Sequence, residues 1–139
     1  MERVYSTPRI DKLGVRPGAR VAIVGVPDLD LRDELRARTH DLTEGQPLAD
    51  TDIVFVAVDR QEELGRLAAL RTTIAPNGAI WVVSRKGKAA TVRDVEVIAA
   101  ARAIGLVDNK VASFSPTHTA LRLVIPVALR TPVRVRAPG

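Results

Sequence analysis

The sequence predicts a three-layer α/β fold, with a mainly parallel sheet that is closed by a C-terminal antiparallel hairpin. Continuous apolar runs at residues 20–25, 52–59 and 79–84 are typical of parallel strands covered on both faces. A helical pattern follows each run, which indicates right-handed crossovers between parallel strands. Two β-rich runs, residues 110–114 and 120–127, end the pattern and predict the hairpin.

The N-terminal part is expected to hold a short helix, the first strand and an amphipathic helix. Thr7 is placed as the cap of the short helix, Pro8 as its first residue and Gly14 as its end. After the first strand, leucine recurs at helical spacing among charged residues, and Asp28 or Asp30 caps this second helix.

The middle of the chain alternates between helices and strands. Residues 40–50 are polar and predict a loop with room for a short edge strand. A helix is expected over residues 61–74, and residues 76–78 form a turn into the third strand. Thr91 is placed as the cap of a last helix, which ends at Gly105.

The C-terminal part differs from the rest in its pattern. Residues 115–119 supply the turn of the predicted hairpin. The prediction is therefore a single domain over residues 1–127, followed by an extended or disordered basic arm over residues 128–139.

The composition excludes several classes of function. The chain of 139 residues is 46% hydrophobic, enough for a core of its own, and it has no cysteine. Disulfides, thiol nucleophiles, iron–sulfur clusters and cysteine-zinc sites are thereby excluded. The first residues lack the apolar core of a signal peptide, and no apolar run approaches the roughly 20 residues that cross a bilayer. We expect a cytoplasmic protein without a membrane contact.

The excess positive charge lies near the C-terminus. The formal net charge is +5, and acidic and basic residues are equal in number from the start of the chain to Asp108. Only basic residues follow: Lys110, Arg122, Arg130, Arg134 and Arg136. This pattern is compatible with nucleic-acid binding through the arm, but sparse charges of this kind are more typical of a solvated tail.

The candidate ligand site lies at the carboxyl ends of the three predicted parallel strands, because ligands bind there in open α/β sheets. Basic side chains there can bind a phosphate or carboxylate, and acidic ones can accept from a hydroxyl or amine. Each residue also has a structural interpretation, as a helix cap or a solvated loop residue. The candidates are Gly25, Pro27, Asp28, Asp59, Arg60, Ser84, Arg85 and Lys86.

Gly25 is the only glycine in the turn after the first strand, and Pro27 stands where a second glycine is usual. A dinucleotide or S-adenosylmethionine (SAM) site normally has two or three glycines there. Trp81 is expected in the core, and His118 in the hairpin turn has neither a partner nor metal spacing. We therefore predict no catalytic residue and no metal site.

Three segments carry a resemblance to known families: residues 11–18, residues 24–27 and residues 105–111, together with Trp81 and Lys86. The chain resembles a family of small bacterial proteins of unknown function. That family has a Rossmann-like, class I methyltransferase-like fold and lacks the SAM-binding glycine motif. The resemblance implies the fold and supplies no catalytic residue.

The function predicted from sequence is a non-catalytic binding or protein-interaction module. Its expected partner is a second copy of the chain or another protein, which the segment 120–135 contacts by adding to a neighbouring sheet. The alternative is a small SAM- or nucleotide-binding protein with its site at the strand ends, although no glycine-rich motif supports either cofactor.

Overall fold

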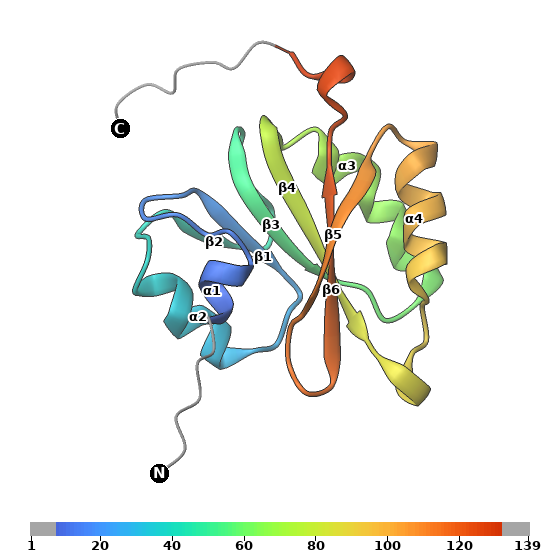
Figure 1. Cartoon of the computed structure of the whole chain (residues 1–139). Coiled ribbons are helices and arrows are strands. Elements are labelled where there is room, and N and C mark those ends of the chain that lie inside the picture. Colours follow the sequence, from blue (N-terminus) through green and yellow to red (C-terminus); the bar gives the residue numbers. More distant parts are fainter. Residues whose placement is uncertain (1–7, 132–139) are drawn as a thin grey trace.

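The computed structural model describes residues 8–131, which form one six-stranded sheet (Figure 1). In the order β2-β1-β3-β4-β6-β5, the first four strands pair in parallel, and β6 is antiparallel to both of its neighbours. The predicted sheet with a closing hairpin is confirmed. The strands are β1 (Val21–Val24), β2 (Leu42–Glu44), β3 (Thr51–Ala57), β4 (Ile74–Arg85), β5 (Val107–Ser113) and β6 (His118–Val124).

Helices cover both faces of the sheet, as the three-layer prediction requires (Figure 1). Helices α1 and α2 pack on one face, and α3 and α4 pack on the other. None of the helices within residues 8–131 is both long and apolar enough to cross a membrane. The α-helices are α1 (Arg9–Lys12), α2 (Leu29–Arg36), α3 (Arg66–Arg71) and α4 (Asp94–Ala103), and the 3-10 helices are η1 (Gln61–Gly65), η2 (Gly87–Ala89) and η3 (Val127–Leu129).

Successive residues of the central strands point to opposite faces, so the core divides into two clusters. Phe55 and Trp81 lie on the face covered by α1 and α2, whereas Val56 and Val82 lie on the face covered by α3 and α4. Trp81 is fully buried, and its Nε1 donates to the carbonyl of Leu13 at 3.0 Å. The prediction that Trp81 belongs to the core is confirmed, and its hydrogen bond fixes α1 against the sheet.

The helix predicted over residues 61–74 is wrong only in its last three residues. It begins as η1, continues as α3 and ends at Arg71, and Ile74 already belongs to β4. Residues 76–78 lie inside this strand, where the pairing of β3 with β4 shifts register. A Cβ on Gly78 would lie 3.0 Å from three backbone carbonyl oxygens. This glycine therefore permits a close backbone approach within the sheet, and does not form a turn.

The predicted caps have mixed outcomes. Asp28 caps α2, since its side chain accepts from the Leu31 N–H at 2.9 Å. Thr91 does not cap α4: its hydroxyl donates to the carbonyl of Asp59 at 2.6 Å, and Arg93 is the N-cap. Two more residues, Val92 and the extended Arg93, thus precede the first residue of the helix. Gly14, with φ of 72°, follows the end of α1 as predicted.

Two predictions fall partly outside the described residues. Thr7, the expected cap of α1, is not described, and Pro8 is the N-cap of this helix. Of the expected arm over residues 128–139, only residues 128–131 are described: Ala128 and Leu129 belong to η3, and Arg130 and Thr131 follow it. The short edge strand allowed for in residues 40–50 is β2.

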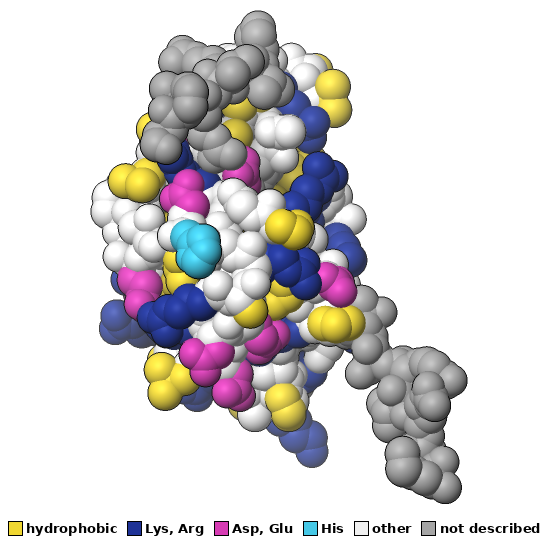
Figure 2. Space-filling view, turned by 90° about the vertical axis from the view of Figure 1, so that its left-hand side faces the viewer, with side chains coloured by type: hydrophobic (Ala, Val, Ile, Leu, Met, Phe, Trp, Pro, Cys, Tyr) yellow, Lys and Arg dark blue, Asp and Glu magenta, His cyan; other side chains and the backbone are white. Residues whose placement is uncertain are grey.

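The face that carries α2 and β2 mixes acidic and basic side chains (Figure 2). Arg20 pairs with Asp41 at 2.9 Å, and Arg32 pairs with Glu44 at 2.6 Å. Because opposite charges alternate, this face has no extended field of one sign.

Candidate functional site

The carboxyl ends of β1, β3 and β4 meet at one edge of the sheet, and the β5–β6 turn lies against the same edge (Figure 1). A pocket of about 610 Å³ opens there, which we call the carboxyl-edge pocket. Its lining residues are Val26, Pro27, Asp28, Leu29, Asp30, Ala57, Asp59, Val83, Arg85, Phe114, Ser115, Pro116, Thr117 and His118.

Four of the eight candidate residues line this pocket: Pro27, Asp28, Asp59 and Arg85. Convergence of the strand ends, on which their prediction depended, brings them together from three separate segments of the chain.

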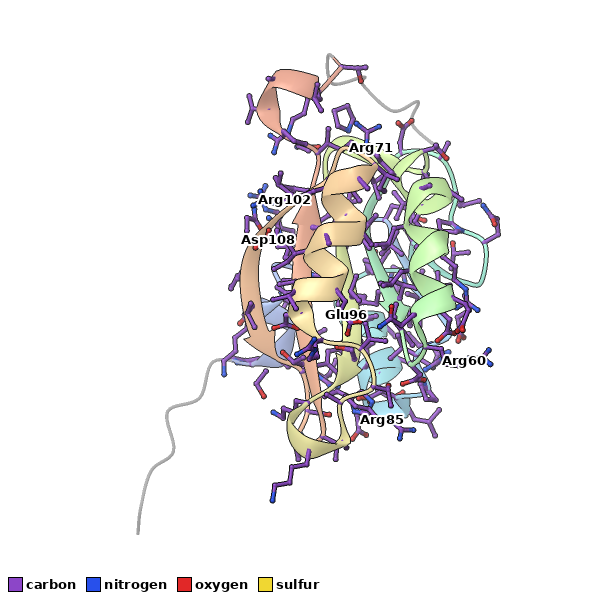
Figure 3. All side chains as sticks on the ribbon, turned by 90° about the vertical axis from the view of Figure 1, so that its right-hand side faces the viewer. Arg60, Arg71, Arg85, Glu96, Arg102 and Asp108 are labelled. Carbon is purple, nitrogen blue, oxygen red and sulfur yellow. The ribbon has the colours of Figure 1, made fainter. Side chains whose placement is uncertain are left out.

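The other four candidates lie nearby but outside the lining. Gly25 is exposed with φ of 74°, and a Cβ there would meet no atom within 4 Å. Ser84 is buried on the sheet, one residue from Val83 and so on the opposite face. Lys86 Nζ lies 3.0 Å from Ser113 Oγ. Arg60 precedes η1 and is exposed near the same edge as Arg85 (Figure 3).

Asp28 has both carboxylate oxygens engaged within the protein. One oxygen caps α2, and the other accepts from Arg9 Nη1 at 2.9 Å. Burial alone raises the pKa of Asp28, but the hydrogen bonds from Arg9 and the Leu31 N–H outweigh it and hold the pKa below its usual value. Asp28 therefore forms a charged wall of the pocket, and it positions Arg9 and the start of α2.

Arg9, which the sequence did not single out, holds this wall in place. Its guanidinium also pairs with Glu34 and donates to the carbonyl of Phe114 at 3.0 Å. Its Cζ lies 4.7 Å from the centre of the Phe114 ring, within range of a cation–π interaction. Arg9 thus joins α1, α2 and the β5–β6 turn. No local sequence signal could reveal it, because its partners are 19 to 105 residues away.

Asp59 follows β3 and faces Arg85 at the end of β4. The Asp59 Oδ1 and Arg85 Nε atoms are 3.7 Å apart, and both side chains are about half exposed. The Asp59 backbone is held more firmly, because its N–H donates to Glu63 and its carbonyl accepts from Thr91. The hydrogen bond from the Asp59 N–H lowers the pKa of Glu63 more than any other contact does. The backbone of Asp59 is therefore fixed at the pocket, whereas its carboxylate is only loosely paired with Arg85.

The hairpin turn contributes a group of polar side chains to the pocket. His118 lies opposite Arg85 in the β4–β6 register, and its Nδ1 lies 2.7 Å from Thr117 Oγ1. Ser115 Oγ accepts from the N–H groups of Thr117 and His118, which fixes the turn. These residues line the pocket because β6 runs antiparallel and so begins at the edge where β4 ends.

The pocket is predominantly acidic. Its lining carries three carboxylates, from Asp28, Asp30 and Asp59, against the single guanidinium of Arg85. Within residues 8–131, no three carboxylate or imidazole groups gather as metal ligands would. The arrangement is suited to accept hydrogen bonds from hydroxyl and amino groups, with one cationic group for a carboxylate.

A family model for a protein of unknown function, DUF3052, matches residues 10–127. The chain belongs to the DUF3052 family. A search of curated proteins gives no significant match. The family match establishes a relationship without an activity.

Solved structures similar to the DUF3052 chain include SAM methyltransferases. A SAM-dependent methyltransferase from Aquifex aeolicus has a TM-score of 0.63 at 15% identity, covering 84% of this chain and 87% of that one. The TehB-like SAM-dependent methyltransferase from Corynebacterium glutamicum has a TM-score of 0.55 at 13% identity, covering 84% and 85%.

A larger enzyme shows the same fold within a longer chain. The mitomycin 7-O-methyltransferase MmcR has a TM-score of 0.62 at 10% identity, and the match covers 78% of the DUF3052 chain but 49% of MmcR. The DUF3052 chain therefore spans about half of that enzyme's length. At these identities the comparisons establish a methyltransferase-like α/β fold and no more.

Proposed function

We propose that this DUF3052 protein is a binding module whose carboxyl-edge pocket takes a cationic or uncharged nucleoside-type ligand, with SAM as the leading example. The acidic lining at the carboxyl ends of the strands is the observation that carries the proposal. Open α/β sheets bind ligands at this edge, and structurally similar proteins include SAM-dependent methyltransferases.

The charges of the lining distinguish between ligand classes. A nucleotide phosphate would face the carboxylates of Asp28, Asp30 and Asp59, of which Asp28 is paired with Arg9 and Asp59 only loosely with Arg85. At about 4 Å, two unit charges repel by roughly 1 kcal/mol in water and several times more near a protein surface. SAM carries a sulfonium and an ammonium group, which the carboxylates attract, and one carboxylate, which Arg85 can bind.

Individual side chains fit these roles to different degrees. Asp30 is exposed in the first turn of α2, and Asp59 is only loosely paired, so both can accept from an amine or a ribose hydroxyl. Asp28 is committed to Arg9 and to the cap of α2. Asp30 and Asp59 are therefore the residues to test for binding, whereas substitution of Asp28 would also disturb the fold.

The proposal is one of binding without group transfer. In the lining, His118 supplies the imidazole, and its Nδ1 lies 2.7 Å from the Thr117 hydroxyl oxygen. A general base of this kind needs a group that orients it, and Thr117 is a weaker partner for this purpose than a carboxylate.

A thermal-shift and calorimetry experiment tests the proposal with SAM, S-adenosylhomocysteine, adenosine and ATP. SAM should raise the Tm of the protein, since a ligand at a hundred times its Kd stabilises the folded state by about 2.7 kcal/mol. The double variant Asp30→Asn/Asp59→Asn should lose this shift.

Asp33→Asn is the matched control, because Asp33 is an exposed acid of α2 outside the pocket lining. It should keep the SAM shift. An equal shift with ATP, or no shift with SAM and adenosine, would contradict the proposal.

Self-association is a second candidate function, favoured by two exposed apolar residues. Val127 is 75% exposed and Leu129 is 55% exposed, both on η3 at the end of β6. We infer that this pair contacts a second copy of the chain, as expected for the segment 120–135. Light scattering of Val127→Ser/Leu129→Ser should then give a lower mass than the wild type. Equal masses would remove this candidate.

A further inference from the structure

A second concave site lies at the opposite edge of the sheet, near the amino ends of the parallel strands. This hollow, of about 640 Å³, lies between the α1–β1 loop, the start of β3 and the strands β4 and β6. The charged and amide side chains that line it are Asp11, Arg16, Arg38, Asp52, Asn77 and Arg122. We call it the amino-edge hollow. It shares no lining residue with the carboxyl-edge pocket.

Arg122 is the unusual residue of this hollow. It lies on β6 opposite Trp81 and is half-buried, and it also lines a smaller hollow of about 220 Å³ beside that tryptophan. Within residues 8–131, its guanidinium forms no hydrogen bond or ion pair, and the charge that acts on it there is the like charge of Arg130. Burial lowers the pKa of Arg122, and the charge of Arg130 lowers it further, yet a guanidinium stays charged.

The cross-strand neighbour of Arg122 adds a second positive charge. Lys110 stands directly opposite Arg122 in the β5–β6 register. Lys110 Nζ donates to the carbonyl of Lys12 at 2.8 Å, so its charge is not neutralised by that contact. Like charges opposite each other destabilise a sheet, and a half-buried unpaired cation does so too. An anion from outside the described residues would reduce the repulsion between Lys110 and Arg122 and give the Arg122 guanidinium a partner.

The acidic residues of the hollow are already engaged. Asp11 accepts from Arg38 at 2.8 Å, and Asp52 accepts from the Arg20 N–H at 2.9 Å and has a further partner. By contrast, the exposed guanidinium of Arg16 has no partner in the described part of the chain, and the Asn77 amide can add donors. With the carboxylates of Asp11 and Asp52 engaged, the groups that can bind a ligand in the hollow are the guanidinium groups of Arg16 and Arg122 and the Asn77 amide.

We propose that the amino-edge hollow binds a small oxyanion, a phosphate or carboxylate group, between Arg122 and Arg16. A guanidinium presents parallel N–H donors that match the oxygens of either group. The concave shape and the carboxylates of Asp11 and Asp52 on the wall favour a small anion over an extended polyanion such as a nucleic-acid strand. This site is independent of the proposed function of the carboxyl-edge pocket.

Calorimetry with pyrophosphate, succinate and a short single-stranded oligonucleotide tests this site. The wild type should bind pyrophosphate or succinate saturably, and whichever binds more tightly identifies the preferred group. Arg122→Met should weaken binding at least about tenfold, the effect of losing one charge-assisted contact. Arg16→Ala, at an exposed position that the fold does not need, should weaken it as well.

Arg60→Ala is the matched control, because it removes an exposed arginine at the opposite edge. Binding of the anion should be unchanged. The free Arg122→Met protein should melt at the same temperature as the wild type or higher, since the substitution removes an unpaired cation. A clear loss of Tm, anion binding that both variants retain, or binding of the oligonucleotide alone would each overturn the assignment.

Discussion

Arg9 joins three elements through one guanidinium, and its loss should show how much that junction contributes. Arg9→Met keeps much of the aliphatic stem but removes the guanidinium from Asp28, Glu34 and the Phe114 carbonyl, and Asp28 then keeps only its backbone donors. Breaking such partly buried pairs costs about 2–3 kcal/mol. We expect a loss of this size in the free energy of unfolding, measured by urea denaturation.

Arg36→Met is the control for Arg9→Met. Arg36 lies 3.8 Å from Asp33 in an exposed i,i+3 pair, so its loss should change stability by less than about 0.5 kcal/mol. Equal effects of the two variants would show that the Arg9 junction contributes no more than a surface ion pair.

The lowered pKa of Asp28 makes the stability of the protein depend on pH. Because its pKa is lower in the folded state, Asp28 contributes stability that is complete above the ordinary carboxyl value of about 4 and is lost as pH falls through the folded value. Asp28→Asn retains an oxygen that can cap α2 but removes the charge. The stability difference between wild type and variant should therefore shrink below about pH 4.

Urea denaturation at a series of pH values measures this difference. Asp33→Asn, at an exposed and weakly paired carboxylate, should show no comparable narrowing. A difference between wild type and Asp28→Asn that stays constant down to the lowest pH would mean that the charge of Asp28 has no special partner in the folded state.

At the scale of the element, η1 and α4 begin in the same way. Each has an arginine at the N-cap, Arg60 or Arg93, whose backbone N–H donates to a glutamate three residues later, at 3.0 Å and 2.8 Å. An arginine side chain has no acceptor, so only half of a capping box can form. The first free N–H groups of α4 consequently lack a side-chain acceptor at the cap.

Arg93→Ser should complete the capping box of α4. The arginine side chain is 76% exposed and lies 3.8 Å from Glu96, so little is lost with it. A serine hydroxyl can accept from the Glu96 N–H, which also donates to the carbonyl of residue 93 at 2.9 Å, and a serine cap typically adds about 0.5–1 kcal/mol. We expect that gain in urea denaturation, with Arg93→Ala giving none. A serine variant no more stable than the alanine variant would contradict this account.

The sequence predicted elements where the signal was local and failed where pairing decided the outcome. Continuous apolar runs identified β1, β3 and the second half of β4, because strands covered on both faces need apolar residues throughout. The start of β4 was missed because Pro76 and Gly78 are usual turn residues. In the structure they lie where β3 and β4 shift register, and only the tertiary contact around Gly78 explains them.

At the scale of the whole molecule, topology decided which candidate residues form a site. The rule that strand ends converge was sufficient to bring Pro27, Asp28, Asp59 and Arg85 together. It could not reveal the turn residues of the hairpin or Arg9, because the rule concerns the carboxyl ends of parallel strands, whereas these residues come from an antiparallel turn and from α1. Arg122 was missed for a similar reason: whether it has a partner within residues 8–131 depends on the side chains that surround it, and no spacing in the sequence records that.

The sheet also predicts how stability is distributed over the molecule. Strand β4 has 12 residues, pairs on both sides and is buried along most of its length, whereas β2 has three residues, pairs only with β1 and is partly exposed. Local opening needs little free energy where few buried contacts must break. Native-state hydrogen exchange should therefore show β2 and η3 exchanging through local opening, and β3, β4 and β6 exchanging only through global unfolding.

Added urea should accelerate exchange in the central strands but not in β2, because only global unfolding exposes much new surface. If the β2 amides exchanged as slowly as those of β4 and responded equally to urea, the β1–β2 edge would belong to the same cooperative unit as the centre of the sheet.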